Sequence, residues 1–284
     1  MNSSATVTIG LPVYNNERFI STMLESVLAQ DYSDFLLLIC DDCSTDSTEE
    51  ICREYADRDR RIRYIRNEQN LGPLENHRKV LDLAESEYFM FARGHEILPQ
   101  DLFSCAMKVL SENKEVVLAN APTLWIDEEG TVQNDKHLLQ YDTRKNGIAN
   151  RCRKILLGKC ESFYGIGLTQ HFRSVRVLEP VVGTDLIMLM EMGLLGSFAV
   201  VPSGNRLRRH YYTEDYGERI KRHSSALAID PDFLDRHFPI LKIPFQLLYS
   251  VWHGKIRFYE KILASVVIIL MSPIKYLLSI GKTQ

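Results

Sequence analysis

The amino-terminal half of the chain alternates between short apolar runs and segments with apolar residues at helical spacing. Phe35–Cys40 is an apolar run without a helical period, and turn-forming residues follow it at once. An apolar run of this length, bounded by turn residues, is typical of a buried parallel strand. The other expected strands begin near residue 7 and span 61–65 and 88–92; the expected helices cover 20–28, 74–84 and 99–113, with another that begins near 47.

Strands that alternate with helices need crossover connections, which are right-handed and build a parallel sheet covered on both faces. The sequence therefore predicts an α/β fold with a doubly wound, mostly parallel sheet. Asn15 or Asn16 is expected to cap the first helix. Ser47-Thr-Glu-Glu50 matches a capping box that would begin the second helix.

The alternation weakens after about residue 116. Thr123–Ile126, followed by Asp127-Glu-Glu-Gly130, predicts a hairpin with a glycine turn. Residues 134–160 are polar, basic and poorly patterned. Regular patterns return at 163–168, and a helix from about Asp185 to Leu195 precedes a strand at 197–201.

From about residue 240, aromatic and basic residues mingle, and an apolar run follows at 262–271. Ten helical residues span about 15 Å, half of a bilayer core, and Pro273 and Lys275 interrupt the apolar residues that continue to Ile280. Basic flanks with aromatic residues favour a segment that lies in the membrane interface. The alternative is an apolar helix packed on the domain. We expect residues 216–284 to be a helical, membrane-associated segment.

Composition excludes some classes of function. The net charge of −3 over 284 residues lacks the basic field of a nucleic-acid-binding protein. The first residues contain no positive region followed by an apolar run, so we expect no signal peptide and a cytoplasmic location. Cys40 and Cys43 form a C-x-x-C, which suits a redox pair or half of a zinc site, but no second C-x-x-C accompanies it. Cys40 also ends a buried strand, where a thiol packs as a small apolar group.

The strand Phe35–Cys40 ends in Asp41 and Asp42, within a D-D-x-S-T-D-x-T loop. Carboxylates just past a parallel strand stand where open α/β sheets bind their ligands. The first strand likewise runs into a polar loop that ends at Glu17. These two units closely resemble the start of a family 2 glycosyltransferase, an inverting enzyme of the GT-A type that uses nucleotide-activated sugars. The resemblance covers about residues 6–210.

The resemblance implies a GT-A domain over residues 1–215, with a nucleotide-binding half of about 6–120 and an acceptor half of about 121–215. In the family, the loops after the first two strands line the nucleotide pocket. Asp42 can instead be a residue that only starts a turn, and a Walker B strand is excluded because no Walker A motif follows a strand. The residues assigned to the nucleotide are Pro12, Tyr14, Asn15, Glu17 and Asp42.

After its fourth strand the family has an acidic motif for a divalent cation, Mg²⁺ or Mn²⁺, that bridges the donor diphosphate. This chain reads Arg93-Gly-His-Glu96 there, so His95 and Glu96 stand at the metal positions. Glu96 remains a plausible ligand, and His95 suits Mn²⁺ better than Mg²⁺. Alternatively, Arg93 and a protonated His95 neutralise the diphosphate without metal. In a third interpretation, the site has decayed and the chain is a silent nucleotide-binding or scaffold protein.

Asp185 lies in a segment that resembles the motif holding the family's general base. A helix cap is the alternative, since aspartate is a good N-cap. Two basic stretches, Arg206–His210 and Lys221–His223, resemble the part of the family that folds over the donor diphosphate. Arg208 and Arg209 are the phosphate ligands implied, because guanidinium groups suit phosphate oxygens; a solvated basic face is the alternative.

The resemblance thus implies transfer of a sugar from a nucleoside diphosphate sugar to an acceptor hydroxyl, with inversion. The acceptor would be a glycan or a lipid-linked molecule, in the assembly of a surface polysaccharide or glycolipid. Asp185 would take the hydroxyl proton. The donor sugar and the acceptor depend on variable loops, which the sequence does not resolve.

Overall fold

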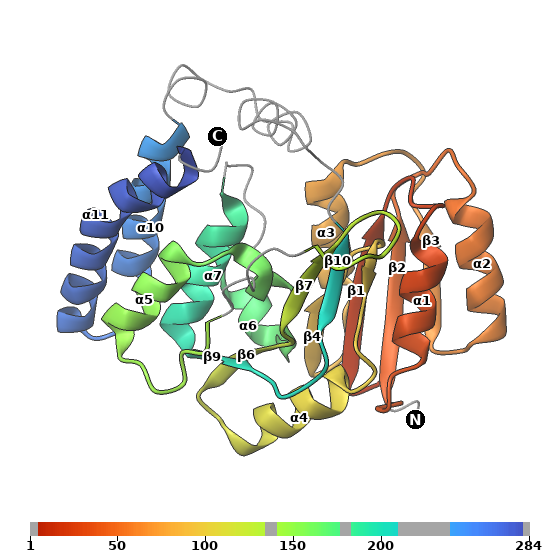
Figure 1. The fold of residues 1–284 in the computed structure, drawn as a ribbon, viewed down its shortest axis with the longest axis horizontal. Coiled ribbons are helices and arrows are strands. Elements are labelled where there is room, and N and C mark those ends of the chain that lie inside the picture. The colour runs from red at the N-terminus through yellow and green to blue at the C-terminus, as the bar shows by residue number, and fades with distance from the viewer. Residues whose placement is uncertain (1–4, 134–140, 177–182, 210–238, 281–284) are drawn as a thin grey trace.

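A computed structural model describes residues 5–133, 141–176, 183–209 and 239–280, and the side chains of 239–241 and 275–280 are left out (Figure 1). The central sheet has the strand order β3-β2-β1-β4-β8. Its first four strands in the sequence are parallel and the fifth is antiparallel to β4, which confirms the predicted fold class. The strands are β1 (Val7–Val13), β2 (Phe35–Asp41), β3 (Ile62–Arg66), β4 (Tyr88–Phe91) and β8 (Gly167–Leu168).

Both faces of this sheet are buried. Leu37 and Ile39 of β2 join the apolar cluster under α1 (Ile20–Leu28) and α4 (Leu102–Glu112), whereas Leu38 and Cys40 join the cluster under α3 (Pro73–Asp82). This alternation explains why the strand reads as continuously apolar. Burial raises the pKa of Cys40 to about 11, in keeping with a thiol packed as a small apolar group at the end of a buried strand.

Polar residues near the first helices do not cap them as expected. Phe19 is the N-cap of α1, and neither Asn15 nor Asn16 caps it through its side chain. Ser47 does precede α2 (Thr48–Arg58), but it makes no side-chain capping bond. Both predictions of side-chain capping were wrong, because these loops bond to each other instead.

A second, three-stranded sheet has the order β5-β10-β7, and β6 (Val116–Asn120) pairs with β9 (Ser197–Val200). The expected turn at Asp127–Gly130 forms, with Gly130 at φ 89° and a single bridge from Ile126 to Val132. The main partner of β7 is nevertheless β10, so the hairpin prediction was right only for the turn. The strands are β5 (Glu96–Ile97), β7 (Thr123–Ile126) and β10 (Arg206–Arg209).

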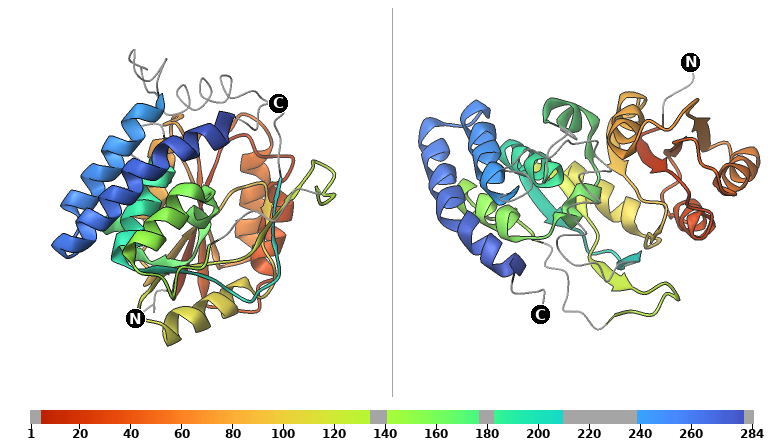
Figure 2. Two further views of the ribbon diagram at one scale, coloured as in Figure 1. Left: turned by 60° about the vertical axis from the view of Figure 1, so that its left-hand side comes forward. Right: turned by 90° about the horizontal axis from the view of Figure 1, so that it is seen from above.

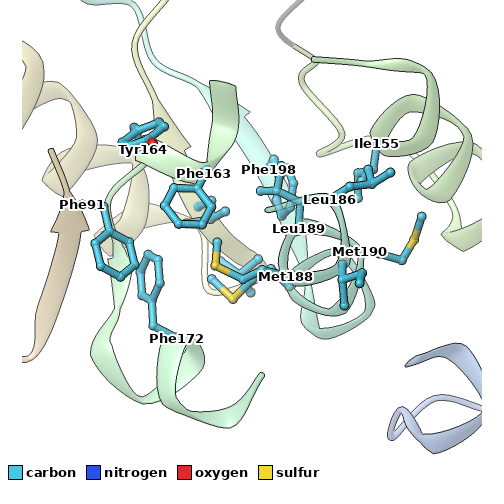
Figure 3. Packing of buried hydrophobic residues seen from close by; sticks show 14 of the residues in the cluster. Phe91, Ile155, Phe163, Tyr164, Phe172, Leu186, Met188, Leu189, Met190 and Phe198 are labelled. Atoms are coloured by element: carbon cyan, nitrogen blue, oxygen red, sulfur yellow. The ribbon is translucent and has the colours of Figure 1, made fainter. Parts of the chain in front are cut away.

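The remaining elements pack against the first half through an aromatic cluster (Figure 3). Phe91 of β4 stacks on Phe163 at 5.1 Å between ring centroids and meets Phe172 edge-on at 5.9 Å. Phe163 belongs to the 3₁₀ helix η1 and Phe172 to α6. These elements are η1 (Cys160–Tyr164), α6 (Thr169–Ser174), α5 (Ile148–Leu157) and α7 (Thr184–Leu195).

Helix α5 lies in the stretch that the sequence pattern left without structure. Its buried side chains are Cys152, Ile155 and Leu156, and basic residues occupy much of the rest. Such a narrow apolar face gives a weak helical period. It is buried because α11 packs across it.

The C-terminal helices α10 (Pro239–His253) and α11 (Phe258–Ile280) lie side by side, on the far side of α5 and α7 from the central sheet (Figure 2). Helix α11 continues through Pro273, one of the two residues that interrupt its apolar run. None of the described helices combines the length and the hydrophobicity needed to cross a membrane. The predicted division at residue 215 remains a prediction.

Candidate active site

The loops after β1 and β2 are joined by a ladder of hydrogen bonds at the carboxyl edge of the sheet. Asn15, at φ 50°, accepts a bond from the Thr45 amide at 2.9 Å and donates its own amide to Ser44 Oγ at 3.0 Å. Glu17 accepts a bond from the Ser47 amide at 2.9 Å. Because both predicted loops hold each other, they form one rigid rim.

The other residues predicted for the first loop lie on this rim. Pro12 is half-buried within β1, opposite Cys40. Tyr14 leaves 47% of its surface exposed, which offers an aromatic ring to solvent or a ligand. The structure thus brings Pro12, Tyr14, Asn15 and Glu17 to the edge at which β2 ends.

Asp42 is 2% exposed, and its carboxylate ties the β2 loop to the segment before α3. Oδ1 accepts bonds from Asn67 Nδ2 and the Leu71 amide, both at 2.8 Å, and Oδ2 accepts one from the Gly72 amide at 2.9 Å. A residue that only starts a local turn would not make these bonds. Contact between Asp42 and a nucleotide remains a prediction.

The loop after β4 lies directly against the first loop. A Cβ on Gly94 would come within 2.1 Å of Asn16 Oδ1, so a larger residue here would require the Asn16 side chain to move. Beyond it, β5 pairs antiparallel with β10 and places Arg208 opposite Glu96. The strand pairing therefore unites the altered metal loop with the basic stretch.

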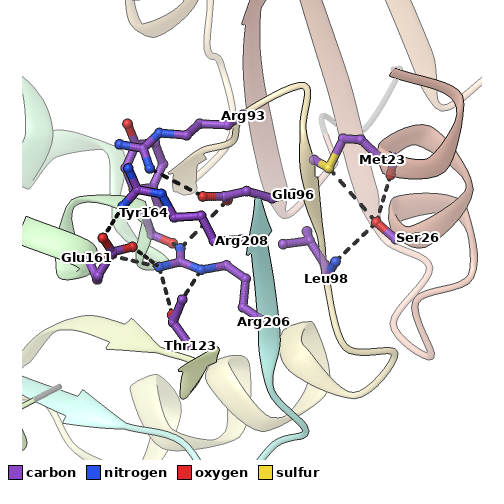
Figure 4. A network of polar contacts seen from close by, with 10 residues as sticks. All are labelled: Met23, Ser26, Arg93, Glu96, Leu98, Thr123, Glu161, Tyr164, Arg206 and Arg208. Carbon is purple, nitrogen blue, oxygen red and sulfur yellow. Dashed lines mark hydrogen bonds and ion pairs between the residues drawn. The ribbon is translucent and has the colours of Figure 1, made fainter. Parts of the chain in front are cut away.

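Arg93, Glu96 and Arg208 point toward one another in a network that also includes Glu161 and Tyr164 (Figure 4). The Arg93 guanidinium lies 3.8 Å from the centre of the Tyr164 ring and 3.5 Å from Glu96 Oε1. Arg208 pairs with Glu161. The sequence singled out neither Glu161 nor Tyr164, because η1 joins the end of the poorly patterned stretch to the start of the next regular one and matches no motif of the resemblance.

Arg206 connects the members of this network, which are Arg93, Glu96, Glu161, Tyr164 and Arg208. It is 2% exposed and donates to Thr123 Oγ1 at 3.0 Å and to the Tyr164 carbonyl at 3.2 Å. It also pairs with Glu161 at 3.3 Å and approaches Glu96 at 4.0 Å. The sequence marked Arg206 as part of a basic stretch but could not distinguish this buried arginine from solvated ones.

His95 sits among the cationic side chains. Burial, and then the charges of Arg93, Arg208 and Arg209, lower the pKa of His95 to about 3. Its carbonyl accepts a bond from Arg209 at 3.4 Å. A lowered pKa disfavours the interpretation in which a protonated His95 neutralises the diphosphate, and that interpretation stays untested.

The residues at the expected metal positions do not fit a divalent cation. Within the described part of the chain, no three His, Cys, Asp or Glu side chains gather into a metal-binding group. Glu96 Oε1 faces Arg93 and Oε2 faces Arg206. A hard divalent cation requires several oxygen ligands. At this position it would also be repelled by the nearby guanidinium charges.

Asp185 is the second residue of α7, and Gly183, in the left-handed region at φ 83°, is the N-cap. The capping interpretation of Asp185 was therefore wrong. Its Oδ1 accepts a bond from the next amide, of Leu186, at 2.9 Å. Burial raises the pKa of Tyr141, and the nearby groups that raise it further include Asp185 and Glu161. The position of Asp185 in the site and its role as a base remain predictions.

Two surface hollows, of about 690 and 540 Å³, lie elsewhere. Their linings include Asn113 and Arg144 in one and Ser86 and Arg173 in the other, and no predicted site residue. His210 and Lys221–His223 fall outside the described residues. The candidate site therefore consists of the rim and of the arginine network, which is the set of side chains around Arg93, Arg206 and Arg208.

Comparisons with known proteins give one family. The profile described as Glycosyl transferase family 2 matches residues 8–167, more than half of the chain. The putative teichuronic acid biosynthesis glycosyltransferase TuaG of Bacillus subtilis is 30% identical over 106 residues, which cover 37% of this chain and 42% of TuaG. The chain spans less than half the length of such curated relatives.

Solved structures share the fold. A crystal structure of S. aureus TarS 1–349 in complex with UDP-GlcNAc superposes with a TM-score of 0.71 at 17% identity, covering 93% of this chain and 71% of that chain. The mannosyltransferase PcManGT of Pyrobaculum calidifontis, in complex with GDP-Man and Mn²⁺, gives a TM-score of 0.56 at 17% identity, covering 98% of this chain and 79% of that chain.

Proposed function

The chain belongs to glycosyl transferase family 2, and on that premise we propose that it transfers a sugar from a nucleoside diphosphate sugar to an acceptor hydroxyl, with inversion. One observation carries the proposal: a net cationic cluster of buried and partly buried arginines lies against the interlocked rim at the carboxyl edge of the sheet. Structural neighbours that contain UDP-GlcNAc and GDP-Man support this class of donor.

The rim would hold the nucleoside. Tyr14 offers an exposed ring for stacking, and Asn15 and Glu17 fix the backbone around it. Asp42 uses its oxygens to hold residues 67–72, so in this conformation it shapes the pocket wall. Its one remaining acceptor direction is what a nucleoside hydroxyl or imide group would use.

The arginine network would hold the diphosphate, through Arg93, Arg208 and Arg209. Asp185 takes the proton from the hydroxyl group of the acceptor molecule. The oxygen of that hydroxyl attacks C1 of the sugar from the face opposite the diphosphate. The bond from C1 to the diphosphate oxygen breaks, and its electron pair leaves with the nucleoside diphosphate. A single displacement at C1, with attack from the face opposite the leaving diphosphate, inverts the configuration of that carbon.

The outer face of α10 and α11 supports a location at a membrane surface. Phe245, Tyr249 and Trp252 recur at helical spacing on α10, and Phe245 is 71% exposed. Helix α11 likewise exposes a helical stripe that includes Leu263 and Leu270, while its Ala264 and Ile268 are buried against the core. The exposed apolar set consists of Phe245, Tyr249, Trp252, Phe258, Tyr259, Ile262, Leu263, Val266, Ile269, Leu270 and Ile274.

An apolar face of this extent is unusual on a protein that stays in water, and Lys255, Arg257 and Lys261 border it. We therefore propose a cytoplasmic enzyme that lies on the membrane and acts on a glycan or lipid-linked acceptor. A role in surface polysaccharide or glycolipid assembly draws support from the similarity to a relative named for teichuronic acid biosynthesis.

A screen of UDP- and GDP-sugars for release of the nucleoside diphosphate, with Mn²⁺, Mg²⁺ or EDTA, tests the proposal. Transfer to an acceptor should give a product of opposite anomeric configuration, which NMR identifies. The second candidate, a silent nucleotide-binding scaffold, is favoured by the loss of the acidic motif at Arg93–Glu96. Nucleotide binding without release from any donor would select the scaffold.

A further inference from the structure

The two carboxylates of the arginine network are separated by a guanidinium group. Arg206 contacts Glu161 at 3.3 Å through one terminal nitrogen and approaches Glu96 at 4.0 Å through the other. Two carboxylates that shared a metal ion would converge on the ion. Here they converge on Arg206, which is itself fixed by Thr123 and the Tyr164 carbonyl.

The formal charges of the network leave an excess equal to that of a divalent ion. Four arginines, at positions 93, 206, 208 and 209, face two glutamates, at 96 and 161, which leaves a charge of +2. Arginine stays protonated in proteins, so this excess does not depend on pH in the physiological range.

The network also has hydrogen-bond donors without acceptors. Among the described residues, Nε of Arg208 and Nε of Arg209 are buried and have no hydrogen-bond partner. Among the same residues, Glu96 Oε2 is a buried acceptor without a hydrogen bond, and the guanidinium of Arg206 faces it at 4.0 Å. Buried donors of this kind are rare unless something binds them. In addition, Arg93 lies near enough to Arg208 to lower the pKa of Arg208, after the larger effect of burial, and such crowding of like charges favours an anion.

We propose that this guanidinium cluster takes the place of the divalent cation and binds the donor diphosphate without metal. The inference rests on the proposed function. As the bond from C1 to the diphosphate oxygen breaks, the electron pair adds one negative charge to the leaving group. Arg93, Arg208 and Arg209 stabilise that charge by hydrogen bonds to the phosphate oxygens. Glu96, Glu161 and Arg206 are positioning residues that hold the guanidinium groups in place.

The two roles of Glu96 predict opposite results for Glu96→Gln. A metal ligand that loses its charge weakens the binding of metal and nucleotide together. A counter-ion that loses its charge raises the excess of the cluster from +2 to +3, so a diphosphate binds as tightly as before or more tightly. Glutamine keeps the shape of glutamate, which protects the packing of this buried position.

Isothermal titration calorimetry on the full chain, with UDP, GDP and pyrophosphate in EDTA or in Mn²⁺, distinguishes these roles. We expect UDP or GDP to bind in EDTA within about threefold of its affinity in Mn²⁺. Arg208→Gln should weaken that binding by about 10- to 100-fold, the scale of a lost charge-assisted hydrogen bond. Arg58→Gln on α2, which removes a surface pair with Glu54, is the matched control and should change nothing.

Binding that appears only with Mn²⁺, and that Glu96→Gln abolishes, would overturn the inference while leaving the proposed function intact. No binding of either nucleoside diphosphate in either buffer, by a chain with a native circular dichroism spectrum, would overturn both. If Glu96→Gln does not fold, Glu161→Gln gives the same test, since Glu161 is the counter-ion of Arg208. Its predicted result is binding in EDTA that is as tight as in the unaltered chain or tighter, and loss of that binding would contradict the inference.

Discussion

Asp42 and Glu96 are both buried carboxylates near the carboxyl edge of the central sheet, yet their surroundings differ. Asp42 accepts bonds from neutral donors, two backbone amides and one side-chain amide. Glu96 faces the charged groups of Arg93 and Arg206. A carboxylate among amides keeps its charge available to organise a loop, whereas one among guanidinium groups is already neutralised. Under the proposed function, Asp42 shapes the nucleotide pocket, whereas Glu96 serves as a counter-ion of the arginines and not as a metal ligand.

The largest expected effect on turnover comes from substitution of Asp185, and not of Asp42 or Glu96. If both edge sites serve donor binding, Asp185→Asn should lower turnover by about 10²- to 10⁴-fold, the range for loss of a general base, and leave nucleotide affinity unchanged. Asp101→Asn, at the N-cap of α4, is the control. Near-normal turnover in Asp185→Asn would return the residue to a purely electrostatic role at the start of α7.

Asp42→Ala should weaken UDP or GDP binding by about 10- to 100-fold, because three buried donors lose their acceptor and residues 67–72 shift. The same change should lower the free energy of unfolding by about 1–3 kcal/mol. Asp42→Asn, which keeps one oxygen, should show smaller losses in both measurements. Unchanged nucleotide affinity in folded Asp42→Ala would mean that Asp42 does not shape the nucleotide pocket, and the contrast drawn with Glu96 would be wrong.

The depressed pKa of His95 makes the stability of the fold depend on pH. Below about pH 6.5 the unfolded chain takes up a proton on His95, while the folded chain, with a pKa of about 3, does not. Stability from this residue is therefore present above pH 6.5 and is lost as the pH falls toward 3, by at most about 1.4 kcal/mol per pH unit.

Urea denaturation between pH 6.5 and 4.5 measures this slope, and His95→Gln should reduce it. Some slope should remain in the variant, because burial also lowers the pKa of His77, to about 4. An unchanged slope would mean that His95 is protonated in the folded protein and belongs to the cationic cluster.

The smallest effects concern the membrane. Lys255→Gln and Lys261→Gln should each weaken binding to anionic vesicles by about 1 kcal/mol, close to fivefold. Arg257→Gln should have less effect, because Glu260 already pairs with Arg257 at 3.2 Å. If the chain does not bind vesicles that contain phosphatidylserine, the apolar face of α10 and α11 does not serve membrane binding.

Local sequence signals predicted the sheet and the rim, because each depends on residues close in the chain. The apolar run before Asp42 and the helical period after it required no knowledge of distant segments. The arginine network could not be predicted in this way, since β10 reaches Glu96 only by pairing with β5. Glu161 comes from a short helix in a region without a pattern, and the basic stretch around Arg206 did not reveal which arginine would be buried.

A crystal structure of the full chain with UDP or GDP, grown once with EDTA and once with Mn²⁺, tests the central claim most directly. We predict phosphate oxygens within hydrogen-bond distance of Arg93 and of Arg208 or Arg209 in both crystals, with the nucleoside against the Tyr14 loop. A diphosphate bridged to Glu96 by a manganese ion, or a nucleotide bound away from these arginines, would contradict the account.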